Sequence, residues 1–275
     1  MCFGLNFPNF KAMEDFRSFL EKNRRAWNQR AEIHMVSGFY DVAGFKEGKT
    51  SLKHIEREIL GEITGKSILH LQCHFGQDTL SLARLGANTT GVDFSERAID
   101  YAKELSEELG VPARFVLSDV LALDLRETFD LVFASYGVIG WVPDLGKWAE
   151  TVARHLGVGG ELILVEFHPF MWLLDEKMRF PYFYSPEPDI ETEQGTYTDG
   201  GEGTAITSCW WNHALSELFS CLKAAGMEVI LFEEFDHSPY PLEGMVERGS
   251  GEHVFKSRED QRLPYCYAIK ATKKV

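Results

Sequence analysis

The chain has 275 residues, a hydrophobic content of 44% and a formal net charge of −14. This length accommodates one large α/β domain, or one domain with a sizeable insertion. The negative charge argues against a nucleic-acid groove or an anionic membrane surface. No apolar run approaches the roughly 18 residues of a membrane span. The N-terminal residues lack the basic and apolar regions of a signal peptide, and the five scattered cysteines are typical of reduced thiols. We therefore expect a cytoplasmic protein that acts on a small molecule.

The first 64 residues are predicted to form a helical extension or lid. Lys11–Met35 has an amphipathic helical pattern, and glycines then mark a loop over residues 38–48. A second helix is expected at Ser51–Leu60, capped by Thr50 or Ser51.

From Lys66 onward, strands alternate with helices, which is typical of a doubly wound parallel sheet. Five strands are predicted here: Ser67–Leu71, Asn88–Asp93, Ala113–Leu117, Phe129–Ala134 and Glu161–Phe167. A glycine-rich turn, Leu156–Gly160, should precede the fifth. A helix is expected to start at Pro143-Asp144 and to run through His155.

The alternation stops between residues 168 and 212, which are rich in aromatic residues, Pro, Gly and acids. This insertion is too long for a simple connection, so we expect a small antiparallel excursion, a lid or substrate region, or both. A helix at His213–Ala225 and strands at Met227–Phe232 and Leu263–Ala271 complete the domain of residues 65–275. The last two strands should form an antiparallel hairpin at an edge of the seven-stranded, mostly parallel α/β sheet.

Asp93, at the end of the second strand, is the first candidate ligand-binding residue. An acid there can accept both hydroxyls of a ribose, which indicates an adenosine-containing cofactor. The alternative is an acid at the start of the following helix. The preceding turn, Gln72–Gly76, has one glycine where a dinucleotide-binding turn needs three, and no P-loop is present.

Several motifs resemble those of the class I S-adenosylmethionine-dependent methyltransferases, over most of residues 66–271. More narrowly, LHLQCHFGQDTLSLARLGA, with NRRAWNQRAEIH and YDVAGFKEGKTSL upstream, looks like a bacterial subgroup of these enzymes, of unknown substrate. The resemblance implies a Rossmann-like fold, S-adenosylmethionine as cofactor, and cofactor-binding roles for Gln72, His74, Gly76, Asp93, Phe94, Ser118, Asp119, Val120 and Ser135.

Within that resemblance, Asp93 holds the ribose and Phe94 packs on the adenine. Ser118-Asp119-Val120 reads the adenine amine, although Asp119 could equally close a turn. Ser135-Tyr136-Gly137 lies where the methionine part and the methyl acceptor meet.

Three positions depart from the family pattern. His70 stands where an acid usually supports the amino group of the cofactor, and Gln72 and His74 replace glycines. The bulk of the last two must therefore point away from the ligand. His70, Cys73 and His74 also suggest a metal cluster, but the ligand set is incomplete, so no metal site is predicted.

Other candidates lie outside these motifs. Trp27, Arg30 and His34 share one helical face and either cover the cofactor or pack their helix on the sheet. Trp210, Trp211 and His213 either form a solvent-shielding wall or pack in the core. The candidate catalytic residues are His168, Tyr136 and His213, with His168 as a general base near the carboxyl ends of the strands.

The sequence thus predicts methyl transfer from S-adenosylmethionine to the oxygen, nitrogen or sulfur of a small molecule by in-line displacement. Such a reaction rests largely on alignment and exclusion of water, so no fixed catalytic triad is expected. The alternatives are a nicotinamide-dependent oxidoreductase and a non-catalytic cofactor-binding protein. We expect a monomer or homodimer that binds neither nucleic acid nor membrane.

Overall fold

The computed structural model describes residues 10–174 and 181–274, and its main sheet has seven strands in the order β3-β2-β1-β4-β5-β11-β8. Residues 1–9 of the predicted extension and 175–180 of the predicted insertion lie outside the described residues. The first five strands in this order are parallel, and β11 runs antiparallel to both neighbours. The strands are β1 (Ser67–Leu71), β2 (Asn88–Asp93), β3 (Arg114–Leu117), β4 (Phe129–Ser135), β5 (Leu156–Phe167), β8 (Met227–Phe235) and β11 (Cys266–Lys273). The predicted fold class is confirmed.

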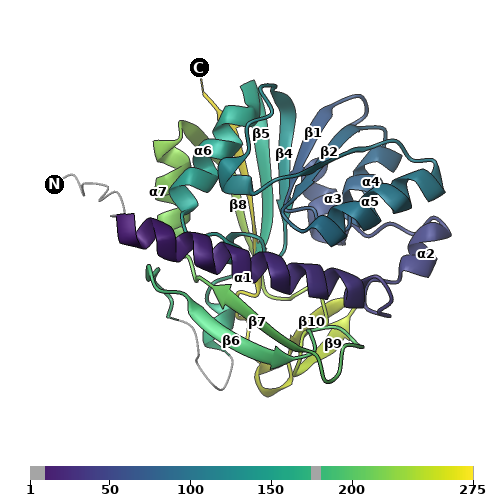
Figure 1. The fold of residues 1–275 in the computed structure, drawn as a ribbon, viewed down its shortest axis with the longest axis vertical. Coiled ribbons are helices and arrows are strands. Elements are labelled where there is room, and N and C mark those ends of the chain that lie inside the picture. The colour runs from purple at the N-terminus through teal and green to yellow at the C-terminus, as the bar shows by residue number, and fades with distance from the viewer. Residues whose placement is uncertain (1–9, 175–180, 275) are drawn as a thin grey trace.

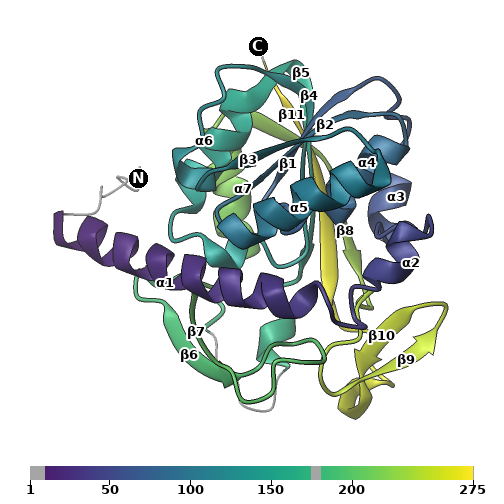
Figure 2. The ribbon, with the colours of Figure 1, turned by 45° about the vertical axis from the view of Figure 1, so that its right-hand side comes forward.

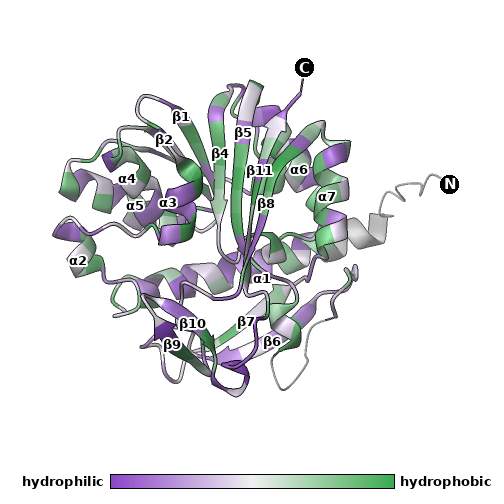
Figure 3. Cartoon of the chain, turned by 180° about the vertical axis from the view of Figure 1, so that it is seen from behind, coloured by the Kyte–Doolittle hydropathy of each residue, from purple (hydrophilic) through white to green (hydrophobic). Residues whose placement is uncertain are grey.

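Helices cover both faces of this sheet (Figures 1 and 2). They are α3 (His54–Leu60), α4 (Gln77–Arg84) and α5 (Glu96–Leu109) on one face, and α6 (Leu145–His155) and α7 (Leu215–Ala224) on the other. Successive strand residues alternate between the two cores: Leu69 packs under α6 and α7, whereas Ile68 packs under α3. Both faces are therefore apolar, as the hydropathy colouring of the central strands shows (Figure 3).

Several element boundaries differ from the sequence prediction. The helix α3 begins at His54, because the Ser51 hydroxyl contacts Ser81 instead of capping it. A short helix, α2 (Val42–Lys46), interrupts the predicted loop, and its Asp41 cap accepts a hydrogen bond from Gly44. Pro143 precedes α6, whose N-cap is Asp144, as expected.

Three further corrections concern the second half of the chain. The glycine-rich turn before β5 belongs to that strand as a bulge, because Phe129 pairs with Leu156 and Leu131 with Glu161. Between β8 and β11 the expected loop contains an additional hairpin, β9 (Met245–Gly249) and β10 (Glu252–Phe255). The helix α7 starts at Leu215, two residues after the predicted start.

The long helix α1 (Phe10–His34) crosses below the carboxyl ends of the parallel strands (Figures 1 and 2). It packs against a hairpin from the predicted insertion, β6 (Asp189–Gln194) and β7 (Ala205–Trp210). The Asn23 amide donates to the Cys209 carbonyl at 2.8 Å and accepts from the Cys209 N–H at 2.7 Å, which fixes the helix to β7. We call α1 and the β6–β7 hairpin the cap. Among the described helices, none is long and apolar enough to cross a membrane.

Gly76 is required by the turn between β1 and α4. Its φ is +80°, and a Cβ atom there would lie 2.7 Å from the Phe115 ring. Gly110, at the end of α5, has a φ of +62° and nothing within 4 Å of its Cβ position. The two glycines share a left-handed backbone, but only Gly76 is sterically enclosed.

We predict that Gly76→Ala destabilises the fold more than Gly110→Ala. The control should lose about 1 kcal/mol through the left-handed backbone alone, whereas Gly76→Ala adds a clash in a packed core, for a total of roughly 2–4 kcal/mol. Urea unfolding of both variants measures the difference. Equal losses would contradict the role of Phe115.

Candidate functional site

The turn after β1 has a left-handed backbone at three residues, of which only Gly76 is a glycine. Gln72, His74 and Gly76 have φ values of +54°, +52° and +80°. A left-handed residue other than glycine costs roughly 1–2 kcal/mol, so the surrounding structure must hold this shape.

The side chain of Gln72 supplies part of that support. Its amide donates to the Val138 carbonyl at 2.7 Å and accepts from the Trp148 indole at 3.2 Å. It thereby ties the end of β1 to the segment after β4. The side chain of His74 turns toward the cap, where its ring lies 5.3 Å from Trp27 and its Nε2 lies 3.3 Å from Nδ1 of His34.

Asp93 joins this turn to the next helix. Its carboxylate accepts the His74 N–H at 2.8 Å and the Ser95 N–H at 2.9 Å. The side chain is buried, and burial raises its pKa to about 6 in spite of these hydrogen bonds. The Phe94 N–H also stabilises this carboxylate, which keeps acceptor capacity for a further donor.

An open pocket of about 340 Å³ lies between the ends of β2 and β3 and the middle of α1; Phe94 lines it, whereas the preceding Asp93 does not. Its lining comprises Phe94, Glu96, Leu117, Ser118 and Asp119 from the domain and Arg17, Leu20, Glu21 and Arg24 from the cap. This volume is within the range of small-molecule sites. Three of the predicted cofactor-binding residues, Phe94, Ser118 and Asp119, thus lie around one pocket.

Asp119 lines this pocket and also caps the 3₁₀ turn η1 (Val120–Ala122) by accepting the Leu121 N–H at 2.9 Å. Two other predicted cofactor residues, Val120 and Gly76, do not line the pocket. The side chain of Val120 is buried in the core, and Gly76 packs against Phe115. Both residues support the site from behind.

A second group of polar side chains lies at the ends of β4 and α3. The Tyr136 hydroxyl donates to Glu56 at 2.6 Å, and the Ser135 hydroxyl donates to Asp78 at 3.1 Å. Burial, followed by the charge of Asp78, raises the pKa of Glu56 to about 7. Sequence analysis missed both acids: Asp78 lies inside the quoted QDT segment, but nothing in the pattern of α3 distinguishes Glu56 from a surface acid.

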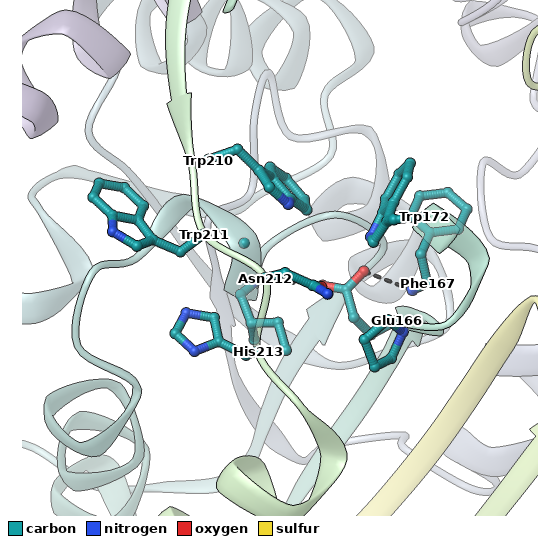
Figure 4. A pocket seen from close by; sticks show the side chains of 10 residues that line it. Glu166, Phe167, Trp172, Trp210, Trp211, Asn212 and His213 are labelled. Atoms are coloured by element: carbon teal, nitrogen blue, oxygen red, sulfur yellow. Dashed lines mark hydrogen bonds between the residues drawn. The ribbon is translucent and has the colours of Figure 1, made fainter. Parts of the chain in front are cut away.

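An aromatic pocket lies next to this group (Figure 4). Trp172, Trp210 and Asn212 surround the Glu166 carboxylate, while Trp211 and His213 point to the other side of the chain. Glu166 accepts hydrogen bonds from the backbone N–H groups of residues 137–139, which fixes the segment after β4. The cavity volume is only about 10 Å³, enough for about one water molecule.

Two of the three predicted catalytic residues have other partners. Both ring nitrogens of His213 are engaged, by Glu217 at 3.1 Å and by the Val142 carbonyl at 2.9 Å. His168 accepts from the Phe170 N–H and lies 3.0 Å from Glu234, and its ring lies against Tyr267 under α7. Tyr136 packs on the opposite face. The structure therefore does not bring His168 and His213 to Tyr136.

His70 is buried behind the turn. Its Nδ1 lies 2.8 Å from the Thr79 hydroxyl, and burial lowers its pKa to about 4, so it is a neutral core histidine. Within residues 10–174 and 181–274, no group of His, Cys, Asp and Glu side chains is placed to hold a metal ion.

The methyltransferase-domain family matches residues 68–160, the part of the chain that contains the turn, Asp93 and the segment after β4. This part is a methyltransferase domain. The class I fold implied by the sequence is confirmed. The comparisons do not favour a nicotinamide-dependent oxidoreductase.

Curated relatives share this domain but not their whole length. A demethylmenaquinone methyltransferase of Lactococcus lactis is 33% identical over 116 residues, which cover 40% of this chain and 46% of that protein. A ubiquinone biosynthesis O-methyltransferase of Methylobacterium is 30% identical over 139 residues, 49% of this chain and 55% of that protein. The chain thus spans about half the length of the curated relatives it matches.

Solved structures match the fold over more of the chain. A structure described as a putative S-adenosylmethionine-dependent methyltransferase from Listeria monocytogenes has a TM-score of 0.57 at 16% identity, and the match covers 85% of this chain and all of that one. A methyltransferase from Methanosarcina mazei has a TM-score of 0.58 at 20% identity, covering 82% and 99%. The core of the methyltransferase domain is shared, whereas the low identities carry no information on the acceptor.

Glu56 gives the methyltransferase domain a testable pH dependence. Its folded-state pKa, about 7, lies above the unfolded value of 4.5, so the folded state loses stability as pH rises between these values. We predict that Glu56→Gln becomes more stable relative to the wild type between pH 4.5 and 8, by up to about 3 kcal/mol. Denaturant unfolding across this range measures the change.

Glu58→Gln is the matched control, because Glu58 is exposed on the same helix. It should leave the pH dependence of unfolding unchanged. A Glu56→Gln profile parallel to the wild type would show that Glu56 is ionised at no cost.

Proposed function

We propose that this protein transfers the methyl group of S-adenosylmethionine to a small-molecule acceptor. The observation that carries the proposal is Asp93, a buried acid at the end of β2, beside the open pocket lined by Phe94 and Asp119. In a methyltransferase domain this is the arrangement that an adenosine requires: an acceptor for ribose hydroxyls, an aromatic side chain and a second acid.

The residues present fit this cofactor. Asp93 can accept a further hydrogen bond, and the neighbouring pocket is open. The side chains of Gln72 and His74 turn away from that pocket, toward Val138 and the cap. We propose that Asp93 holds the ribose, that Phe94, Ser118 and Asp119 hold the adenine, and that the turn from Gln72 to His74 and Ser135 lie along the methionine part. Bound S-adenosylmethionine would supply an electrophilic methyl group for in-line displacement.

The chain contributes alignment and exclusion of water. The cap covers the carboxyl ends of the strands, and the aromatic pocket has a volume of only about 10 Å³. Among the three candidate catalytic residues, Tyr136 is the one whose side chain points to an acid in this region. For acceptors that must lose a proton, we propose that the Tyr136 oxygen takes it while the Tyr136 hydroxyl proton passes to the Glu56 carboxylate.

The proposed acceptor is a small molecule. Two curated relatives have names that refer to quinone biosynthesis, and we infer for this chain only a small molecule of that general size. A cytoplasmic location, a monomeric or homodimeric state and the lack of nucleic-acid and membrane partners stay predictions. The division into an extension at 1–64 and a domain at 65–275 with a lid is likewise our proposal.

Calorimetry tests the cofactor directly. S-adenosylmethionine and its demethylated product should bind, and NADH should not. Binding of NADH alone would overturn the proposal. Release of the demethylated product in a metabolite screen then distinguishes an enzyme from a cofactor-binding protein without catalysis.

We further predict that Asp93→Ala weakens binding of the demethylated product by about tenfold or more, because charge-assisted hydrogen bonds to the ribose are lost. Circular dichroism should show a folded chain. Asp100→Ala, an exposed acid on α5, is the control and should bind normally. Unchanged affinity in Asp93→Ala would remove Asp93 from the site.

A further inference from the structure

Arg30 is a buried cation on the inner face of α1. Its residue is 3% exposed. The guanidinium lies between two aromatic rings, with its central carbon 5.5 Å from the centre of Trp27 and 5.4 Å from that of Trp141. Cation–π contacts of this kind hold the guanidinium in place without satisfying its N–H groups.

The hydrogen bonds of Arg30 are incomplete. Nη2 donates to the Ser208 hydroxyl at 3.3 Å and to Glu193 at 3.4 Å, both long for a charged donor. Nε and Nη1 are buried and, within the part of the chain that the structure describes, have no partner. These two nitrogens carry three of the five N–H donors of an arginine. A buried charge with so many unpaired donors is costly unless a ligand completes it.

The acid that the described residues place in contact with Arg30, Glu193, is a weak partner. The side chain of Glu193 is 44% exposed, so water competes for its carboxylate and screens the pair. The contact also shows that solvent reaches to within one residue of the guanidinium. An incoming anion can therefore displace Glu193 and enter from the side of β6.

Arg30 and the residues around it are not among those that line the open pocket. Trp141 follows β4, and Ser208 and Glu193 lie on the hairpin of the insertion. The open pocket, which we propose for the adenosine, is lined by an earlier part of α1. That part ends at Arg24, six residues before Arg30, or about 9 Å along the helix.

We propose that Arg30 binds a carboxylate of the methyl acceptor, which makes the substrates of this enzyme small organic acids. This proposal rests on the proposed function and adds the class of acceptor. The carboxylate of the cofactor itself has the same chemistry, so the experiment must separate the two sources. Arg30 is then a specificity-determining residue, and not the cofactor-binding residue that the sequence suggested.

The test compares benzoate with benzamide, which has the same shape without the charge. Each is titrated by calorimetry into the full chain, with and without saturating S-adenosylhomocysteine. Benzoate should bind at least about tenfold more tightly than benzamide, since only the carboxylate gains charge-assisted hydrogen bonds. Equal affinities, or no binding of benzoate, would overturn the proposal.

Two variants locate the effect. Arg30→Gln should weaken benzoate by about tenfold or more and leave S-adenosylhomocysteine nearly unchanged. Glu193→Gln, which removes the competing acid from an exposed position, should tighten benzoate severalfold. It provides an independent test if Arg30→Gln does not fold, and weaker or unchanged binding of benzoate would contradict the proposal.

A third ligand identifies the source of the carboxylate. 5′-Methylthioadenosine carries the nucleoside of the cofactor without its amino acid. If Arg30→Gln weakens S-adenosylhomocysteine but not methylthioadenosine, Arg30 holds the cofactor and the inference is wrong. If the wild type binds benzoate but neither adenosine compound, the proposed function fails while the anion site stands.

Discussion

The carboxylate of Asp93 connects the two turns on which the rest of the site depends. It accepts one backbone N–H from the turn after β1 and another from the start of α5. Parallel strands end at the same edge of a sheet, so an acid on the last residue of β2 reaches both turns. Burial raises the pKa of this acid, and a ribose would replace part of the solvation that it loses.

The turn after β1 shows how this domain can do without two glycines. Glycine is usual at left-handed positions because it has no Cβ, but Gln72 and His74 occupy them here. The amide of Gln72 is bound by Val138 and Trp148, and the ring of His74 by the aromatic residues of the cap. The strain is offset by contacts with segments far away in the sequence. The cap thus supports the backbone of this turn.

The ligand-facing residues could be predicted to different degrees. Asp93 is the last residue of β2 and Asp119 lies two residues after β3, so local pattern places both at the carboxyl edge of the sheet. Phe94 and Ser118 adjoin them and lie around the same pocket. His168 also follows a strand, but its ring turns toward Tyr267 on the far face. The position of a residue at a strand end sets where its backbone lies and leaves open which way its side chain points.

By itself, the sequence determined the alternation of strands and helices in the core and the acid at the end of β2, because both depend on patterns within a few dozen residues. The tertiary structure alone decided which distant residues meet. Glu56 reaches Tyr136 across 80 positions, and Arg30 reaches Ser208 across 178. Such contacts arise from the packing of α1, α3 and the β6–β7 hairpin on the sheet. Burial there sets the charge of Glu56 and leaves Arg30 with unpaired donors, and no local pattern records burial by a distant segment.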